Sequence, residues 1–238
     1  MEAAGYATLS RQSGLMREMR VIANNIANSA TTGYRQEGLI FSEFVQSAPG
    51  QESLSMSRAN IFNTSMEQGQ LTKTGGTFDF AVEGDGFFMV ETPQGERLTR
   101  SGAFSPNSAG DLVTMDGYRV LDAGRAPVFV PPDAGKIEVG ADGSISANGR
   151  LLGQLGLFKP MESHALVRED GVMFRVEGEI EETLEASVLQ GFLEGSNVNA
   201  ISEVTRMIEV QRAYEMGQSF LESEDERIRN AIKNLIKT

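Results

Sequence analysis

Few side chains in this sequence have the types and the spacing that chemistry requires. The stretch GDGFF at residues 84–88 offers two glycines of a dinucleotide-binding loop, but the third glycine of that spacing and the following helix are missing. Asp142 in ADGS begins like a calcium loop, yet Asp or Asn does not recur at alternate positions after it. Both stretches are better interpreted as turns beside β-strands.

The single histidine and a carboxylate cluster are the remaining catalytic candidates. His164 stands near Glu162, Glu169 and Asp170, but a triad also needs an activated serine, and no G-x-S-x-G elbow occurs. The run GEIEETLE at 178–185 is acidic, but nothing in it indicates a raised pKa. An exposed loop histidine and a solvated charged surface are the better interpretations. We therefore predict no enzymatic activity, no cofactor, and no catalytic, cofactor-binding or metal site.

The composition excludes several other classes of protein. The 238 residues contain no cysteine, which excludes disulfides and thiol chemistry, and one histidine, which leaves only carboxylate-type metal sites. The net charge of −12 repels a phosphate backbone, so nucleic acid is not an expected partner. The amino-terminal stretch has neither the basic start nor the apolar run of a signal peptide. No apolar run approaches the ~18 residues of a membrane span, and composition alone predicts a cytoplasmic protein.

A first long helix is predicted over residues 3–27. Apolar residues recur on one row at seven-residue spacing, namely Leu9, Met16 and Ala23, with Ile26 on the adjacent row. Such a stripe is costly to leave in water, at ~25 cal/mol per Å2 of apolar surface. It must therefore pack against another helix or another molecule.

A second long helix is predicted from about residue 198 to residue 237, where no proline occurs. Asn199 or Ser202 can cap its start. Its apolar row, again at seven-residue spacing, comprises Met207, Tyr214, Leu221, Ile228 and Leu235. The companion row is apolar only at its ends, whereas a two-stranded coiled coil has two apolar rows. The pattern favours several weaker contacts within a larger bundle.

The middle of the chain predicts an all-β domain of short strands. Five dipeptides favour tight turns between paired strands: Asp85-Gly86, Asp116-Gly117, Asp142-Gly143, Asn148-Gly149 and Asp170-Gly171. The apolar or alternating runs between them are FFMV (87–90), YRVL (118–121), VFV (128–130), KIEV (136–139) and QLGLF (154–158). Residues 36–75, rich in Ser, Gln, Asn and Gly, predict an extended connector with a few pairing segments such as ANIFNTS.

The polar run NNIANSATTGY at residues 24–34 follows directly on the first helix. Asn24, Asn25 and Asn28 carry donors and acceptors suited to a helix end, and Gly33 can adopt a positive φ. We interpret the run as the turn that ends the helix and redirects the chain toward the β domain.

Three stretches taken together resemble the bacterial flagellar rod and hook protein family. VIANNIANSATTGYR (21–35) is similar to its amino-terminal signature, and LQGFLEGSNVNAISEVTRMIEVQRAYEMGQ (189–218) is similar to its carboxy-terminal signature. Residues 80–121 resemble the start of its β domain. The likeness covers nearly the whole chain, and two separated signatures in the right order are highly specific. The short connector and the stretch GEIEETLEASVLQGFLEGSNV favour the proximal-rod branch, with the distal-rod branch or a hook-type axial protein as alternatives.

The resemblance implies an α+β fold in which the terminal helices pair as a helical, coiled-coil-like domain, with an all-β domain of short antiparallel strands inserted between them. The implied domains are a discontinuous helical rod core (1–35 and 196–238), an extended connector (36–76 and 180–195) and an outer β domain (77–179). A carboxylate-metal enzyme or a soluble binding module is the alternative of a different class.

The resemblance also implies a function, partners and a location. The chain would be a structural subunit of the basal-body rod, polymerising through its terminal helices into the hollow shaft that transmits torque. Its partners would be other copies of itself, the neighbouring inner-rod and distal-rod subunits, and the flagellar type III export apparatus. Export without a cleaved signal peptide would place it in the periplasmic rod, which replaces the cytoplasmic prediction.

The expected assembly interface follows from the two signatures and the apolar rows. The amides of residues 24–34 can bond to neighbouring subunits or within their own turn, and both alternatives remain open. The predicted interface residues are Leu9, Met16, Ala23, Asn24, Asn25, Ile26, Asn28, Gly33, Leu193, Gly195, Asn197, Met207, Ile208, Tyr214, Leu221, Ile228 and Leu235.

Overall fold

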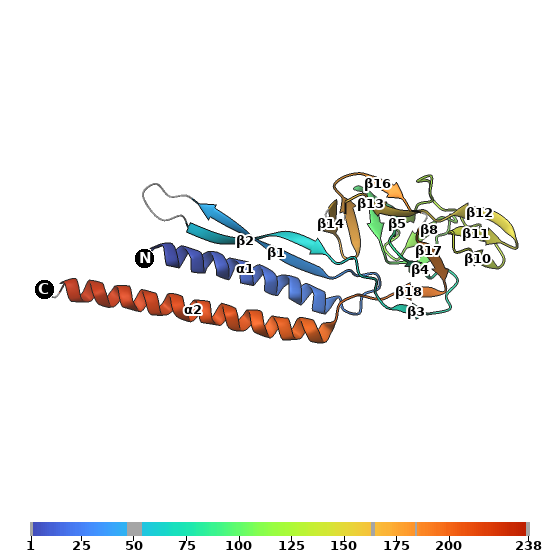
Figure 1. Ribbon diagram of the computed structural model, residues 1–238. Helices are drawn as coiled ribbons and strands as arrows, with labels where there is room; N and C mark the ends of the chain where they lie inside the picture. Colours follow the sequence, from blue (N-terminus) through green and yellow to red (C-terminus); the bar gives the residue numbers. More distant parts are fainter. Residues whose placement is uncertain (1, 47–53, 163–164, 184, 237–238) are drawn as a thin grey trace. The chain divides into compact units, whose positions relative to one another are not determined.

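The computed structural model describes residues 2–46, 54–162, 165–183 and 185–236, and the side chains of all of these except 2–7, 41–46, 54–62 and 235–236. The chain divides into two compact units (Figure 1). One, which we call the helical unit, comprises Met1–Ala27, Glu37–Asn63 and Asn199–Thr238. The other, the β unit, comprises Asn28–Gln36 and Thr64–Val198.

The helical unit contains the two predicted helices, α1 (Glu2–Ala27) and α2 (Ala200–Ile236). Both predictions are confirmed within two residues at the ends. Of the two candidate caps of α2, the structure selects Asn199, whose Oδ1 accepts hydrogen bonds from the backbone N–H groups of Ile201 and Ser202, both at 3.1 Å. This is the usual way in which an N-cap side chain satisfies the first free amides of a helix.

The helical unit also contains a two-stranded sheet, in the region that was predicted as an extended connector with a few pairing segments. β1 (Glu37–Gln46) pairs with β2 (Leu54–Thr64), and the segment ANIFNTS lies at the end of this second strand. The strands form because Ile, Phe, Val and Thr, which favour β structure, are interspersed among the polar residues that dominate the composition here.

The two helices contact each other through faces that are partly polar. The buried face of α1 carries Glu18, Val21, Ile22 and Asn25. The guanidinium of Arg206 on α2 donates two hydrogen bonds to Oε1 of Glu18, from Nη2 at 2.7 Å and from Nε at 2.9 Å. These contacts join the helices within one chain, and the coiled-coil character of the pairing stays a prediction.

The β unit is built from short strands, as predicted. Their bounds are β3 (Leu71–Lys73), β4 (Phe80–Glu83), β5 (Phe87–Thr92), β6 (Gly95–Thr99), β7 (Phe104–Pro106), β8 (Leu112–Thr114), β9 (Arg119–Val120), β10 (Ile137–Val139), β11 (Ser144–Ala147), β12 (Arg150–Gln154), β13 (Leu157–Pro160), β14 (Leu166–Glu169), β15 (Met173–Val176), β16 (Ile180–Glu182), β17 (Ser187–Gln190) and β18 (Phe192–Glu194).

The largest sheet has the order β14-β15-β6-β5-β9-β8-β7, and β13 pairs with both β5 and β16. Smaller sheets are β10-β11-β12, β17-β4 and β18-β3. The ladders described in this unit are antiparallel. The predicted α+β class is therefore confirmed. Because β17 and β18 pair with β4 and β3, the last strands of the unit close onto its first strands.

Two apolar clusters form the core of the β unit. The larger one includes Phe80, Phe88 and Leu112, and the smaller one includes Phe87 and Phe174, whose ring centroids lie 5.9 Å apart in an edge-to-face arrangement. The run FFMV in β5 is buried at all four positions because β5 is an interior strand of the sheet, with residues facing both clusters.

Four of the five predicted hairpin turns are confirmed, at Asp116-Gly117, Asp142-Gly143, Asn148-Gly149 and Asp170-Gly171. The prediction at Asp85-Gly86 is wrong in one respect: the turn joins β4 to β5, but β4 pairs with β17 and β5 pairs with β6, β9 and β13. The predicted strand VFV is also wrong, because Phe129 makes only an isolated bridge to Asp111. A local dipeptide predicts a turn but not the partner of the strand that follows it.

Candidate functional site

The amino-terminal and carboxy-terminal signature segments lie side by side in the β unit. The N–H of Gly33 donates to the carbonyl of Glu194 at 2.8 Å. Asn197 accepts a hydrogen bond from the N–H of Gln36 at 2.6 Å and donates through Nδ2 to the carbonyl of Glu67 at 2.8 Å. The structure thus brings Gly33 together with Asn197 and with Leu193 and Gly195, which flank Glu194.

Gly33 occupies a position that other residues cannot easily fill. Its φ is +71°, which confirms the expected positive φ. A Cβ added there would lie 2.3 Å from the backbone nitrogen of Ser101 and 2.6 Å from the carbonyl carbon of Arg100. The turn therefore needs a glycine both for its conformation and for its contact with the chain between β6 and β7.

A buried ionic cluster joins the same two segments. The Glu194 carboxylate lies between the guanidiniums of Arg35 and Arg100, with N–O distances of 3.2 and 3.1 Å, and all three side chains are 1% exposed. Glu194 also accepts the backbone N–H of Gly69 at 2.9 Å. Arg100 donates to the carbonyls of Val82 and Gly84, at 3.1 and 2.6 Å, and Arg35 donates to the carbonyl of Glu67.

Two cations and one anion leave this cluster with an excess of positive charge. Burial, and next the neighbouring Arg35 guanidinium, lower the pKa of Arg100 to about 10, while Glu194 acts in the opposite direction. Burial likewise lowers the pKa of Arg35, again opposed by Glu194. A lowered pKa means that the charged form of the arginine is less favourable in the folded protein than in the unfolded chain. The cluster therefore lowers the free energy of unfolding, and packing elsewhere must offset this loss. Glu194 is the main group that opposes this loss, and the carboxylate of Asp85 makes a smaller contribution in the same direction.

A third arginine connects these two segments to the edge strand of the large sheet. The Arg168 guanidinium, from β14, lies 4.3 Å from the ring centroid of Tyr34 and 4.8 Å from that of Phe174. It also donates to the carbonyl of Arg35. Tyr34 and Arg35, which are neighbours in the chain, are therefore held by both aromatic and ionic contacts.

Asn25 is the part of the polar run that lies in the helical unit, and it is 1% exposed. Its Nδ2 donates to the carbonyl of Glu37 at 2.8 Å and to Oε2 of Glu203 at 3.1 Å, and its Oδ1 accepts the N–H of Glu37 at 3.0 Å. Asn25 thus ties α1 to the start of β1 and to α2 within one chain. Asn24 is exposed and Asn28 half-buried, the latter accepting a hydrogen bond from Thr31 in the turn.

Replacing Asn25 by leucine is expected to impair motility. Leucine keeps the volume but leaves the amide and carbonyl of Glu37 without their side-chain partner, at about 1–3 kcal/mol for each buried group left unpaired. The measurement is swimming in soft agar together with the number of flagella per cell. Asn230→Leu, the same substitution at an exposed position of α2, is the matched control and should swim normally. Equal swimming of the two variants would show that the Asn25 contacts are dispensable.

The predicted apolar rows of the helices differ in exposure. On α1, Leu9, Met16 and Ala23 are all exposed, whereas Ile26 is half-buried. On α2, the row is half-buried at Met207, Tyr214 and Leu221 and exposed at Ile228, while the side chain of Leu235 lies outside the described residues. Ile208 is exposed. The role of these residues in assembly stays a prediction.

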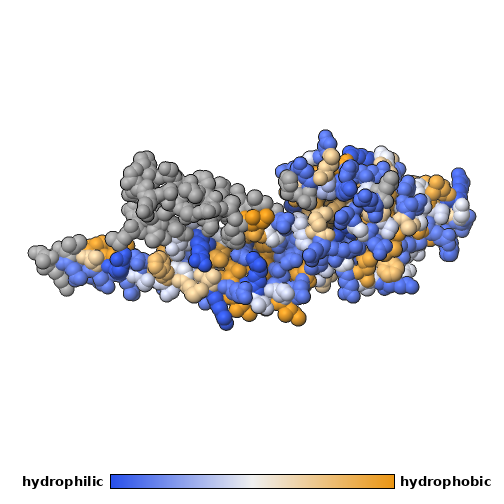
Figure 2. All heavy atoms as spheres, viewed as in Figure 1, coloured by the Kyte–Doolittle hydropathy of each residue, from blue (hydrophilic) through white to orange (hydrophobic). Residues whose placement is uncertain are grey.

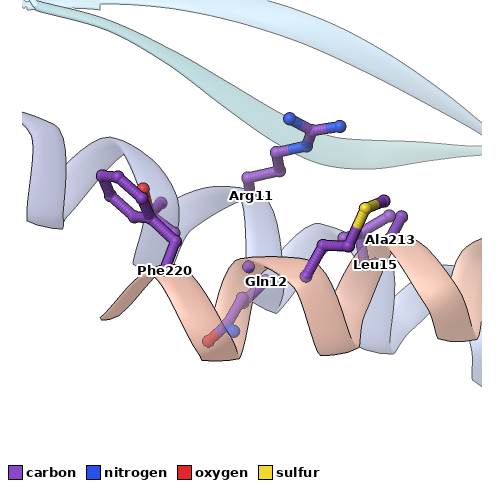
Figure 3. Close-up of a pocket in the computed structure, with 8 residues that line it drawn as sticks. Arg11, Gln12, Leu15, Ala213 and Phe220 are labelled. Atoms are coloured by element: carbon purple, nitrogen blue, oxygen red, sulfur yellow. The ribbon is translucent and has the colours of Figure 1, made fainter. Parts of the chain in front are cut away.

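A hollow of about 390 Å3 lies between the two helices (Figure 3). It is lined by Thr8, Arg11, Gln12 and Leu15 of α1 and by Ala213, Met216, Gly217 and Phe220 of α2. The absence of a side chain at Gly217 allows close approach, because an added Cβ would lie 3.4 Å from Nε2 of Gln12. With one charged residue and no paired acid and base in its lining, the hollow has the character of a packing surface.

The described part of the chain contains no group of three or more acidic or histidine side chains placed to hold a metal ion. Nor, within those residues, is either helix apolar enough over a sufficient length to cross a membrane. His164 lies outside the described residues.

The sequence analysis missed the ionic cluster. Arg35, Arg100 and Glu194 each stand inside one of the three stretches that carry the resemblance, and each has an aromatic, small or apolar neighbour in the chain. These neighbours were the available signal that the three charged residues are buried, because charged residues are almost never fully buried unless they are paired. Nothing local identified which charges would meet across 159 residues of sequence separation (194 − 35).

Comparison with known proteins places the three stretches in one family. Residues 6–35 match the model of the flagella basal body rod protein, residues 81–147 that of the flagellar hook protein FlgE/F/G D1 domain, and residues 189–234 that of the flagellar basal body rod FlgEFG protein C-terminal. These matches cover both signatures and include the three residues of the buried ionic cluster, Arg35, Arg100 and Glu194.

Among full-length relatives, the flagellar basal-body rod protein FlgF of Mesorhizobium japonicum is 39% identical over 99% of this chain and 98% of its own length. FlgF of Rhizobium meliloti is 37% identical over the same shares of the two chains. The rod protein FlgG of Agrobacterium fabrum is 34% identical over 91% of this chain and 93% of its own length. The chain therefore belongs to the flagellar basal-body rod protein family, a family of structural proteins rather than enzymes, and resembles its FlgF members along their whole length.

Proposed function

We propose that this chain is a structural subunit of the proximal rod of the bacterial flagellum. Its terminal helices polymerise around the axis of a hollow shaft, and the shaft transmits torque. Residues 1–35 and 196–238 form the inner core of the assembled rod, residues 36–76 and 180–195 the connector, and residues 77–179 the outer domain. The neighbours along the shaft are other copies of the chain and the inner-rod and distal-rod subunits.

The observation that carries this proposal is the apolar surface of the helical unit. Large apolar side chains lie exposed on both helices, among them Met216 at 68% and Ile201 at 82%. Figure 2 shows hydrophobic residues at the surface along this part of the chain. An exposed apolar surface of this kind marks an interaction site in soluble proteins, and membership of the rod protein family supports rod assembly as that interaction.

The route to the rod follows from the same proposal. The chain passes through the flagellar type III export apparatus without a cleaved signal peptide and acts in the periplasm. Basal bodies purified from the native host test this directly. Mass spectrometry should find the chain with its first residues intact, and cryo-electron microscopy should locate it between inner-rod and distal-rod subunits. Its absence from basal bodies would refute the proposal.

Replacing Leu221 by aspartate is expected to block assembly while sparing the β unit. Leu221 is half-buried at the centre of the predicted apolar row, and an unpaired carboxylate buried there costs several kcal/mol. The variant should be exported but leave cells without complete flagella, as seen by electron microscopy and soft-agar swimming. Ser219→Asp, at an exposed position nearby, introduces the same charge and should assemble. Normal flagella in the Leu221 variant would show that this row is not an assembly contact.

A further inference from the structure

The hollow between α1 and α2 has the size and shape of a site for a small, elongated ligand. Its volume of about 390 Å3 lies within the range of ligand pockets, ~300–1,000 Å3. On each helix the four lining residues stand at positions i, i+3, i+4 and i+7, which share one helix face. The hollow therefore runs along about two turns of both helices.

The walls of the hollow are suited to packing against apolar atoms. Leu15 is half-buried, and Met216 and Phe220 are 68% and 43% exposed. An alkyl chain laid between these three side chains would remove apolar surface from water, which is favourable in proportion to the area buried. Methionine adapts its shape to such a chain because it is unbranched and polarisable.

Gln12 supplies a donor that has no acceptor. Its Nε2 is buried and makes no hydrogen bond to any of the described residues. Figure 3 shows the side chain extending from α1 across α2, and a Cβ added at Gly217 would lie 3.4 Å from Nε2. A buried N–H group without a partner is costly, so an acceptor atom on a ligand would be stabilising here.

Arg11 makes the mouth of the hollow positive. It is the charged residue of the lining and is exposed, and Figure 3 shows it extending from α1 on the side away from α2. Glu215, which stands between two lining residues of α2, is not part of the lining, and its Oε1 accepts a hydrogen bond from Gln211 at 3.0 Å. The local charge is thus opposite to the net charge of the chain, −12.

We propose that the hollow binds a free amphipathic anion, a single extended alkyl chain that ends in a carboxylate. The alkyl chain lies along Leu15, Met216 and Phe220. The carboxylate stays at the mouth, where it accepts a hydrogen bond from Gln12 and pairs with Arg11. A lipid with two acyl chains is larger than this volume. The site belongs to one copy of the chain, so the inference is independent of the proposed function.

The absence of tryptophan from the sequence allows a single fluorescent reporter. The full chain carrying Phe220→Trp is titrated with sodium decanoate below its micelle-forming concentration. We expect a saturable shift of the emission to shorter wavelength, because the indole ring loses contact with water. Phe129→Trp, at a 51% exposed position of the β unit, is the matched control and should show no saturable shift.

Variants of the reporter chain test the two parts of the site. Arg11→Gln should raise the Kd for decanoate about fivefold, the contribution of an exposed charge pair. Arg20→Gln, at an exposed position of the same helix, should leave the Kd unchanged. Gly217→Leu should abolish binding because its side chain fills the hollow. Since leucine favours helix more than glycine, circular dichroism should show full helix content in this variant.

The charge of the ligand gives a further test. Decylammonium has a chain of the same length and the opposite charge, and it should bind at least about tenfold more weakly than decanoate, although the net charge of the protein attracts it.

Three outcomes would overturn the inference. They are equal shifts at residues 129 and 220 or no saturable shift at residue 220, equal Kd values for decanoate and decylammonium, and unchanged binding by a fully helical Gly217→Leu variant. The presence of the chain in basal bodies tests the proposed function separately, so either can fail without the other.

Discussion

Replacing Glu194 by glutamine is expected to lower the free energy of unfolding of the β unit by about 3–5 kcal/mol, the usual cost of removing one partner from a buried ion pair. Glutamine keeps the shape but removes the negative charge between Arg35 and Arg100, which are both 1% exposed. For a unit of this size the loss corresponds to a decrease in Tm of roughly 10 °C. Differential scanning calorimetry of the full chain measures it.

A surface ion pair in the same unit supplies the control. Glu91 and Arg119 lie 2.9 Å apart, with side chains 44% and 48% exposed. Glu91→Gln makes the same chemical change in a solvated position, where an ion pair contributes about 0–1 kcal/mol. Similar small shifts in Tm for both variants would show that Glu194 is not the essential counter-charge of the two buried arginines.

Replacing Gly33 by alanine is expected to destabilise the β unit by about 3 kcal/mol or more, from backbone strain and overpacking that each cost about 1–3 kcal/mol. The strain arises from the φ of +71°. The overpacking arises because the new Cβ would meet backbone atoms of Ser101 and Arg100, which cannot rotate away as a side chain would. Valine, with two further carbons, should prevent the turn at residue 33 from forming at all.

Gly75 separates these two contributions. Its φ of +74° is nearly the same, but a Cβ there would meet nothing within 4 Å. Gly75→Ala should therefore lose only the strain, about 1 kcal/mol, and the difference between the two variants in thermal unfolding measures the clash at residue 33. Equal losses would mean that the contact between residue 33 and the chain near Ser101 contributes nothing to stability.

The features that sequence analysis predicted are those encoded by neighbouring residues. The two helices are evident because heptad spacing persists through Leu9, Met16 and Ala23 and from Met207 onward without proline. Gly33 and four Asp-Gly or Asn-Gly turns follow from positive φ values, which Gly adopts freely and Asn and Asp adopt more readily than most residues. In each case a short window contains the physical cause.

The features that it missed depend on residues far apart in the chain. The Arg35–Glu194–Arg100 cluster needs three segments to converge, and β4 turns away from β5 because β17 arrives to pair with it. The apolar row of α1 was recognised, but its outward direction was not, because that direction depends on α2. The β1–β2 ribbon was predicted only in part, at the pairing segment ANIFNTS, because polar composition masked the other β-favouring residues.

The closure of β17 and β18 onto β4 and β3 has a consequence for the order of events during synthesis. Because a chain is synthesised from its amino terminus, Arg35 and Arg100 are made long before Glu194. The two cations therefore lack their counter-charge until most of the β unit has been made. Pairing of β17 and β18 with β4 and β3 also closes a long loop. The conformational entropy of that loop is lost before the contacts form, so this pairing is slow. Completion of the fold is thus postponed until residue 194 has arrived, and in the proposed export this delay would leave most of the β unit unfolded.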